Sequence, residues 1–212
     1  MKLTRFMQEK FPDLELRPPL FYNWDIGIRF ELGVGWERGM AYYDSPYLLG
    51  CYKRAITLFE AIHKPTDDIF VVIDVLDLKR GKTINRELQN FSPYVEKSLL
   101  YRVKHQTLPF IYPEDDEDGA FKTQRFTLKC KAGEVKYKPL LKALCNTDLG
   151  LKPLIYHRVY FVNINQETIY HVYDDRGSDL LATSPETIRS IYNKFNEWIL
   201  DYDRNEIDEV FS

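Results

Sequence analysis

The last third of the chain constrains the fold most, because short apolar runs alternate there with turn residues. Residues 155–164 and 168–173 have the composition of strands and are separated by three residues, which predicts an antiparallel pair. A turn at 174–177 leads into a third apolar run at 179–182. We therefore expect a β-meander, followed by a helix that begins at Pro185.

Upstream of this meander, the sequence predicts both helices and strands. Apolar residues three or four apart predict helices, whereas alternation or a run of β-branched residues predicts strands. A hairpin is expected after residue 32, because Gly33 and Gly35 can turn the chain into a returning strand at 39–43. The expected helices span 3–11, 45–62, 95–103 and 137–145, and the expected strands span 26–32, 69–75 and 125–130.

These elements predict one α+β domain over residues 1–212, because no repeat, linker or change of composition divides the chain. Its sheet is expected to be antiparallel or mixed, with the meander at its C-terminal end and helices covering it. The run 69–75 is almost entirely apolar, which is typical of a strand buried on both faces.

Composition excludes several classes of protein. Lys and Arg total 29 against 32 Asp and Glu, a net charge of −3, so we expect neither a nucleic-acid partner nor an anionic membrane. No stretch approaches the roughly 20 apolar residues that span a bilayer, and the N-terminus lacks the apolar core of a signal peptide. The three cysteines are widely spaced, which argues against disulfides or a cysteine zinc site and favours the cytoplasm.

The segment Asp174–Asp179 is the strongest candidate site. Asp174, Asp175, Arg176 and Asp179 lie at a turn between two expected strands. One interpretation is structural, because Asx side chains satisfy tight turns and an arginine can pair with a carboxylate. The other is a ligand or metal site, which requires the carboxylates to converge on a point within about 3 Å.

Histidines extend this second interpretation. His171 lies three residues before Asp174, and His157 lies on the strand expected to pair with it. A His–Asp pair could perform acid–base chemistry, although solvent-facing strand positions explain the same pattern. No phosphate loop, nucleophile elbow or zinc-binding His-Glu-x-x-His sequence occurs, and we expect no metal or cofactor.

Two further surface features suggest protein binding. The acidic loop 114–118, which includes Asp115 and Asp116, is either a solvated loop or a docking site for a basic partner. Trp36 lies in a glycine-rich loop and would be an interface hot spot if it were exposed.

The sequence Tyr173–Asp179 (YDDRGSD), followed by Ile191–Arg204 (IYNKFNEWILDYDR), resembles the bacterial domain-of-unknown-function family 3885. Members of that family typically carry YDDRGCD at the first position, so Ser178 stands where a cysteine is usual. Pro19–Gly33 and Tyr52–Phe59 are similar to Bacillus-type members as well. The resemblance implies a family without an assigned chemistry, and Ser178 argues against a thiol nucleophile or ligand at that position.

Two main functions remain from these observations, and a purely structural or oligomerisation module is a third alternative. The first is a non-enzymatic protein-binding module, such as an immunity protein that neutralises a basic toxin domain. The second is a metal-dependent hydrolase or nucleotide-binding enzyme that uses Asp174, Asp175, Asp179 and His171. The sequence favours the first, because it contains no recognisable catalytic set.

Overall fold

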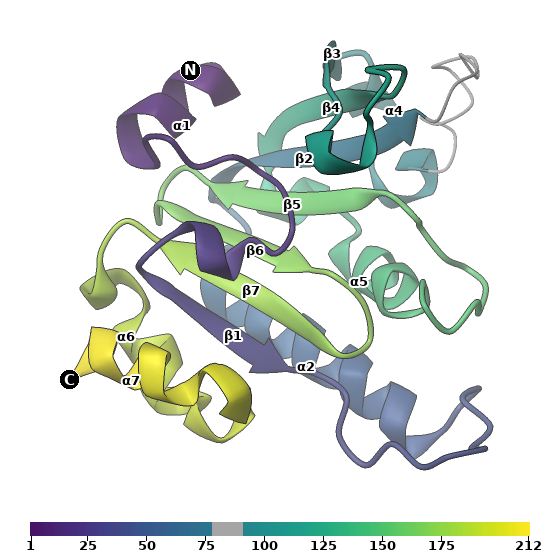
Figure 1. Cartoon of the computed structure of the whole chain (residues 1–212), viewed down its shortest axis with the longest axis vertical. Helices are drawn as coiled ribbons and strands as arrows, with labels where there is room; N and C mark the ends of the chain where they lie inside the picture. The colour runs from purple at the N-terminus through teal and green to yellow at the C-terminus, as the bar shows by residue number, and fades with distance from the viewer. Residues whose placement is uncertain (78–90) are drawn as a thin grey trace.

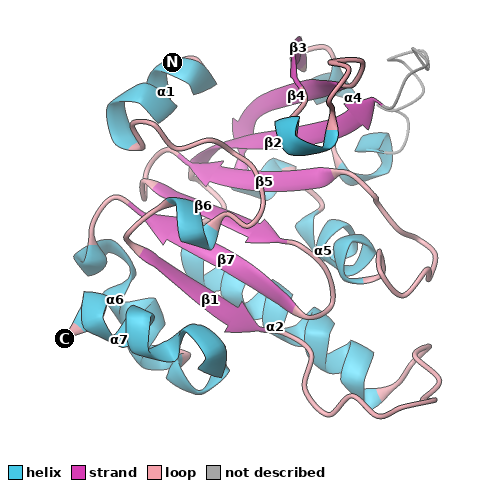
Figure 2. Ribbon diagram, in the orientation of Figure 1, coloured by secondary structure: helices cyan, strands magenta, loops and turns pink. Residues whose placement is uncertain are grey.

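A computed structural model of the chain describes residues 1–77 and 91–212; the charged stretch 78–90 lies outside the described residues. Its centre is an antiparallel sheet of seven strands in the order β1-β7-β6-β5-β2-β4-β3 (Figures 1 and 2). The strands are β1 Gly27–Glu31, β2 Asp68–Asp77, β3 Lys104–Pro109, β4 Lys122–Lys131, β5 Arg158–Asn163, β6 Thr168–Val172 and β7 Gly177–Ala182. The α-helices of the described residues are α1 Leu3–Lys10, α2 Pro46–Ile62, α4 Lys97–Leu100, α5 Tyr137–Cys145, α6 Pro185–Lys194 and α7 Arg204–Phe211. The predicted α+β class is confirmed.

The predicted meander forms the middle of the sheet. β5, β6 and β7 are consecutive in the chain and adjacent in space, and His171 on β6 pairs with Asp179 on β7. β1 adds to the far side of β7, where Arg29 pairs with Asp179. Residues from the two ends of the chain therefore lie next to each other on neighbouring strands.

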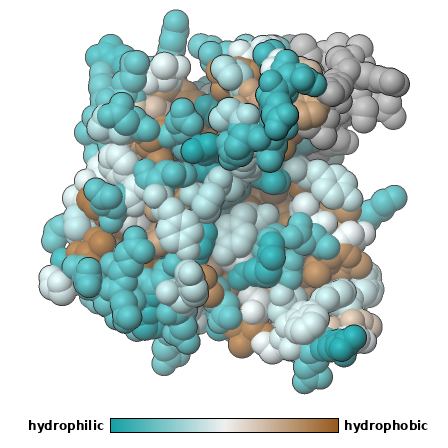
Figure 3. Space-filling model, in the orientation of Figure 1, coloured by the Kyte–Doolittle hydropathy of each residue, from teal (hydrophilic) through white to brown (hydrophobic). Residues whose placement is uncertain are grey.

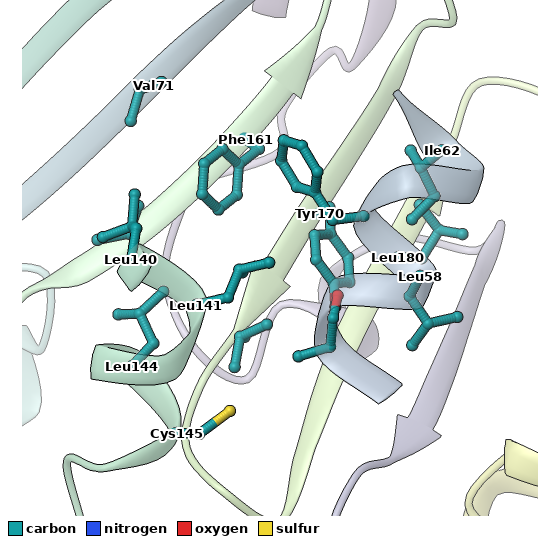
Figure 4. Packing of buried hydrophobic residues seen from close by; sticks show 14 of the residues in the cluster. Leu58, Ile62, Val71, Leu140, Leu141, Leu144, Cys145, Phe161, Tyr170 and Leu180 are labelled. Carbon is teal, nitrogen blue, oxygen red and sulfur yellow. The ribbon is translucent and has the colours of Figure 1, made fainter. Parts of the chain in front are cut away.

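Helices α2 and α5 cover one face of the sheet. Their apolar stripes point at the strands, as Figure 4 shows for Leu58 of α2 and Leu141 of α5 around Phe161 and Tyr170. The cap of α2 matches the sequence prediction, because the Ser45 hydroxyl accepts a hydrogen bond from Leu48 N at 3.1 Å. These helices bury the larger of two apolar clusters, which also includes residues of α6 and α7.

The N-terminal segment covers part of the opposite face. Phe6 of α1 lies against Phe70 of β2, with ring centroids 6.3 Å apart, and Leu20 is fully buried above the same face. β2 is therefore buried on both sides: Val71 belongs to the cluster under α2 and α5, whereas Val72 belongs to the one under the N-terminal segment. This confirms the expectation drawn from its apolar sequence.

The two edges of the sheet differ. At β1, the chain after α6 lies along the edge, where Leu200 N donates to Arg29 O at 2.9 Å and Ile199 bridges to Phe30. β3 forms the other edge among the described strands, and five of its six residues are exposed.

The expected hairpin at 39–43 is wrong. Residues 32–45 form a loop, because β7 occupies one side of β1 and the segment at Ile199 occupies the other. Met40 and Tyr42 instead turn inward and pack against the core.

Two expected helices are shorter than the sequence predicts. Only Lys97–Leu100 is helical within 95–103, since Val95 bridges to Val135 and Lys104 already begins β3. The last helix ends at Lys194, and the chain continues in 3₁₀ turns before α7. Among the described residues, no helix has the length and apolar character needed to cross a bilayer.

Candidate functional site

The signature segment, residues 173–179, makes a tight turn from β6 to β7. Asp174 Oδ1 accepts a hydrogen bond from Arg176 N at 2.7 Å, which closes the turn locally. A Cβ at Gly177 would overlap the Tyr173 hydroxyl and lie 2.7 Å from Phe30 O. Gly177 is therefore required by the close approach of β1, independently of any ligand.

Asp174 is bound by the arginine two residues after it. Arg176 Nε donates to Asp174 Oδ2 at 2.9 Å, and Nη2 donates to the same oxygen. The same Nη2 reaches Asp148 Oδ2 at 3.1 Å, which ties the turn to the segment after α5. The Asp174 side chain is buried, whereas that of Arg176 is 70% exposed, so this arginine shields the carboxylate from solvent.

Asp175 is bonded to a different partner, at the start of α2. Its Oδ2 accepts a hydrogen bond from the Tyr47 hydroxyl at 2.5 Å, and both residues are buried. Burial raises the pKa of Asp175, while the Tyr47 hydrogen bond opposes that rise. A Cβ at Gly33 would overlap the Tyr47 hydroxyl, so this glycine makes room for the contact.

Asp179 lies on β7 and belongs to a separate ion-pair network. Its Oδ1 is 3.1 Å from Arg29 Nε, and its Oδ2 accepts from Phe21 N at 3.2 Å. Arg29 Nη1 is 3.4 Å from Asp203 Oδ2, so one guanidinium joins two buried carboxylates from distant parts of the chain. Burial raises the pKa of Asp179, and the charge of Arg29 opposes the rise.

Aromatic residues complete this network. The Tyr22 hydroxyl accepts from Arg29 Nη1 at 2.9 Å and donates to Asp203 Oδ1 at 2.8 Å. The guanidinium carbon also lies 4.7 Å from the Tyr22 ring centroid and 5.6 Å from that of Tyr173. The network therefore holds three segments together: the 3₁₀ turn Phe21–Asn23, the pair β1 and β7, and the turn before α7.

His171 is buried beside Asp179 and is not solvent-facing. Its Nδ1 donates to Val159 O at 2.9 Å, and its ring stacks on Tyr160 with centroids 4.5 Å apart. Burial lowers the pKa of His171 to about 4, so the ring is neutral at neutral pH. The half-buried His157 lies just before β5, so it is not on the strand that was expected to carry it.

The structure therefore separates the carboxylates that the sequence grouped. Asp174 is bound by Arg176, Asp175 by Tyr47, and Asp179 by Arg29. Within residues 1–77 and 91–212, no group of three or more His, Cys, Asp and Glu side chains is arranged to hold a metal ion. The cysteines in these ranges are free and buried. The convergent geometry that metal-dependent chemistry requires is not formed by Asp174, Asp175 and Asp179.

The acidic loop lies far from this segment. Asp116 closes its own turn, because its carboxylate accepts from Ala120 N at 2.8 Å and from Phe121 N at 3.1 Å. Asp115, in contrast, is exposed. The loop joins β3 to β4, and these strands are three to five positions away from β6 and β7 in the sheet, a span of about 14–24 Å at the usual spacing of strands.

Trp36 lies in a third place, on the loop that follows β1. Its side chain is 55% exposed, and its Nε1 donates to the Tyr42 hydroxyl at 2.9 Å. The candidate residues thus fall into three regions: the signature segment with its partners, the acidic loop, and the loop that carries Trp36.

Four residues that hold the signature segment and its surroundings in place were not singled out from the sequence. Arg29 appeared only as the polar member of an alternating strand, and Tyr22, Tyr47 and Asp203 carried no local signal. Arg29 and Tyr22 lie within Pro19–Gly33, and Asp203 lies within Ile191–Arg204. Both stretches carry the family resemblance, and this was the one signal in the sequence that connected these residues with the signature segment.

Comparison with known proteins agrees with that resemblance. A family model described as a domain of unknown function (DUF3885) matches residues 3–203. The chain belongs to this family. It is 30% identical over 211 residues to an uncharacterised Bacillus subtilis (strain 168) protein, YnaE, an alignment that covers 95% of this chain and 99% of the relative. No solved structure matches the chain.

The family match includes every member of the buried network. Residues 3–203 contain Arg29 near one end and Asp203 at the other. Arg29, which also pairs with Asp179 of the signature segment, joins the two ends of the matched region through its ion pair with Asp203.

Proposed function

We propose that this DUF3885 protein is a non-enzymatic protein-binding module, and that it binds its partner through the aromatic loop, residues 34–43. The carrying observation is the exposed Trp36, whose ring is fixed by the hydrogen bond to Tyr42. Tryptophan and tyrosine side chains contribute most to the energy of many protein interfaces. An aromatic side chain that is already ordered loses little entropy on binding.

The loop is held in place by the core beneath it. The Tyr42 ring lies 6.2 Å from that of Tyr47, and Met40 packs against the main apolar cluster. Three more large apolar residues of this loop and of the first turn of α2 are exposed: Val34 at 50%, Tyr43 at 76% and Leu49 at 50%. Figure 3 shows brown and pale residues grouped at the lower right, where this loop follows β1 in Figure 1.

The finer form of the proposal is an immunity protein that neutralises a basic toxin domain. The acidic loop supports it, because Asp115, Glu117 and Asp118 are exposed and would attract a cationic partner. Since this loop lies at the far end of the sheet from Trp36, it would accelerate association, whereas the aromatic loop would determine the lifetime of the complex.

The test begins with co-purification of the tagged full chain from its native host, followed by titration with the purified partner. Trp36→Ala with Tyr43→Ala is expected to weaken binding by about 30-fold, which corresponds to about 2 kcal/mol for loss of a hot spot. Tyr156→Ala with Tyr202→Ala is the matched control, because these side chains are 65% and 87% exposed elsewhere. Equal affinity of the two double variants would exclude the aromatic loop as the binding surface.

The immunity form needs its own measurement. The captured partner, expressed alone, should be toxic, and co-expression of this chain should restore growth. Asp115→Asn with Asp118→Asn should slow association at low salt and leave dissociation unchanged. A partner without toxicity would contradict the immunity role while leaving protein binding intact.

A further inference from the structure

A groove lies at the β3 end of the sheet, on the face opposite α2 and α5. One wall is α1 with residues 11–17, and the other is the stretch from Lys104 to Pro113. Its floor is formed by Phe70 of β2 and by Arg125, Thr127 and Lys129 of β4. The groove measures about 850 Å³, within the range of small-molecule sites.

The walls of this groove are mostly apolar. Met7, Leu14 and Leu16 line it from the N-terminal side, and Leu108 and Ile111 line it from the β3 side. In Figure 3, brown surface is visible between α1 and the β3–β4 pair at the top of the view, with hydrophilic residues around it. An aliphatic chain would therefore find apolar contacts on both sides.

Some of the cationic side chains that line the groove are paired with carboxylates, and others are not. Arg125 is bonded to Asp74, with Nη2 and Oδ2 2.6 Å apart, and Arg17 lies near Glu15. Arg102, Lys104 and Lys129 also line the groove, and within the described residues they form no ion pair. Asp68 on β2 is paired with Lys131 at 2.9 Å, and its carboxylate also interacts over a longer distance with the charges of Lys129 and Arg102, so it offsets only part of their positive charge.

These three cations lie toward one end of the groove. In the strand register, Lys129 is opposite Phe70 and Lys104 is opposite Thr127, whereas the neutralised Arg125 is opposite Asp74. The groove thus combines an apolar channel with positive charge concentrated toward one end. Such a site is complementary to a molecule with an aliphatic body and a single anionic head.

We propose that the groove binds a small amphiphilic anion, namely an aliphatic carboxylate. Its chain lies between α1 and the segment 108–111, and its carboxylate lies at Arg102, Lys104 and Lys129. This site is independent of the aromatic loop, which is at the opposite end of the sheet.

The test is calorimetric titration of the full chain with decanoate, decanol and acetate. Decanoate is expected to bind saturably with one molecule per chain. Decanol lacks the charge and acetate lacks the aliphatic chain, so each is expected to bind at least about tenfold more weakly than decanoate. Lys104→Gln with Lys129→Gln should weaken decanoate binding by about tenfold. Leu108→Trp, which fills the channel, should weaken decanoate and decanol alike.

Matched variants keep the outcome interpretable. Lys53→Gln with Lys136→Gln removes the same charge from exposed positions outside the groove and should leave decanoate binding unchanged. Lys104→Arg with Lys129→Arg should retain binding, which separates loss of charge from loss of folding. Absence of saturable decanoate binding, equal affinity for decanol, or equal effects of the groove and control variants would each overturn the proposal.

Discussion

Replacement of Arg29 by alanine tests the buried network most directly. The side chains of Asp179 and Asp203 are 1% and 2% exposed, so the substitution leaves two carboxylates in the interior without their cation. Breaking a buried ion pair in this way costs about 3–5 kcal/mol. Because Phe21 N and the Tyr22 hydroxyl still donate to these carboxylates, we expect the lower end, about 3 kcal/mol.

The loss should depend on pH in a defined direction. Burial already raises the pKa of Asp179, and removal of the Arg29 charge raises it further. A carboxyl group whose pKa is higher in the folded state than in the unfolded state binds more protons in the folded state. The protein therefore loses stability as the pH rises from the unfolded-state pKa of that group through its folded-state pKa. The gap between wild type and Arg29→Ala should therefore be smaller at pH 4 than at pH 7.

Urea unfolding followed by tryptophan fluorescence measures this gap at each pH. Arg5→Ala is the control, because its pair with Glu9 is exposed and is expected to contribute little to stability. In a double-mutant cycle, Asp179→Asn should cost less in the Arg29→Ala background than alone. A loss for Arg29→Ala within about 1 kcal/mol of the Arg5→Ala loss, or a gap independent of pH, would refute the reasoning.

Two further predictions concern stability. Gly177→Ala should destabilise the protein by about 1–3 kcal/mol, because its Cβ would overlap the Tyr173 hydroxyl. Gly50→Ala, in open space within α2, should instead stabilise it by up to about 1 kcal/mol, and equal midpoints of urea unfolding for the two variants would contradict both expectations. Burial lowers the pKa of His63 and of His171 to about 4. Between about pH 4 and 6.5 the unfolded chain therefore binds more protons than the folded chain, so the free energy of unfolding falls as the pH decreases through that window, by about 3 kcal/mol per histidine. His171→Gln should flatten this dependence in a urea series, and an unchanged slope would count against the burial argument.

Local pattern was sufficient for much of the fold. The apolar spacing of 45–62 and 137–145 predicted α2 and α5 to within one residue at each end. The short turns of the C-terminal third predicted the meander, because neighbouring runs in sequence pair when the connection is too short for a crossover.

Long-range pairing was not accessible in this way. The pattern at 26–32 identified β1 but not its partner, which lies about 150 residues later. β3 was missed because nearly all its side chains are exposed, so it lacks the alternation that marks a half-buried strand.

The same limit applies to the candidate site. Its turn chemistry was visible in the sequence, and the pairing of Arg176 with Asp174 follows from their proximity. The partners of Asp175 and Asp179 come from α2 and β1, and only the folded register brings Tyr47 and Arg29 to them. For that reason, a structural network and a convergent ligand site could not be distinguished from sequence.

The pairing of β1 with β7 also constrains how the chain can acquire its structure during synthesis. β1 lies near the N-terminus, yet its hydrogen-bonding partner ends at Ala182 and its outer edge is covered at Leu200. At about 5–20 residues per second, β1 waits on the order of ten seconds for that partner to be translated. Until then its apolar Ile28 and Phe30, which are fully buried in the finished fold, have no β7 to pair with. β1 is thus among the last strands to be completed, and a chain that ends before residue 177 lacks β7 and leaves the hydrogen-bonding groups of β1 without their partner.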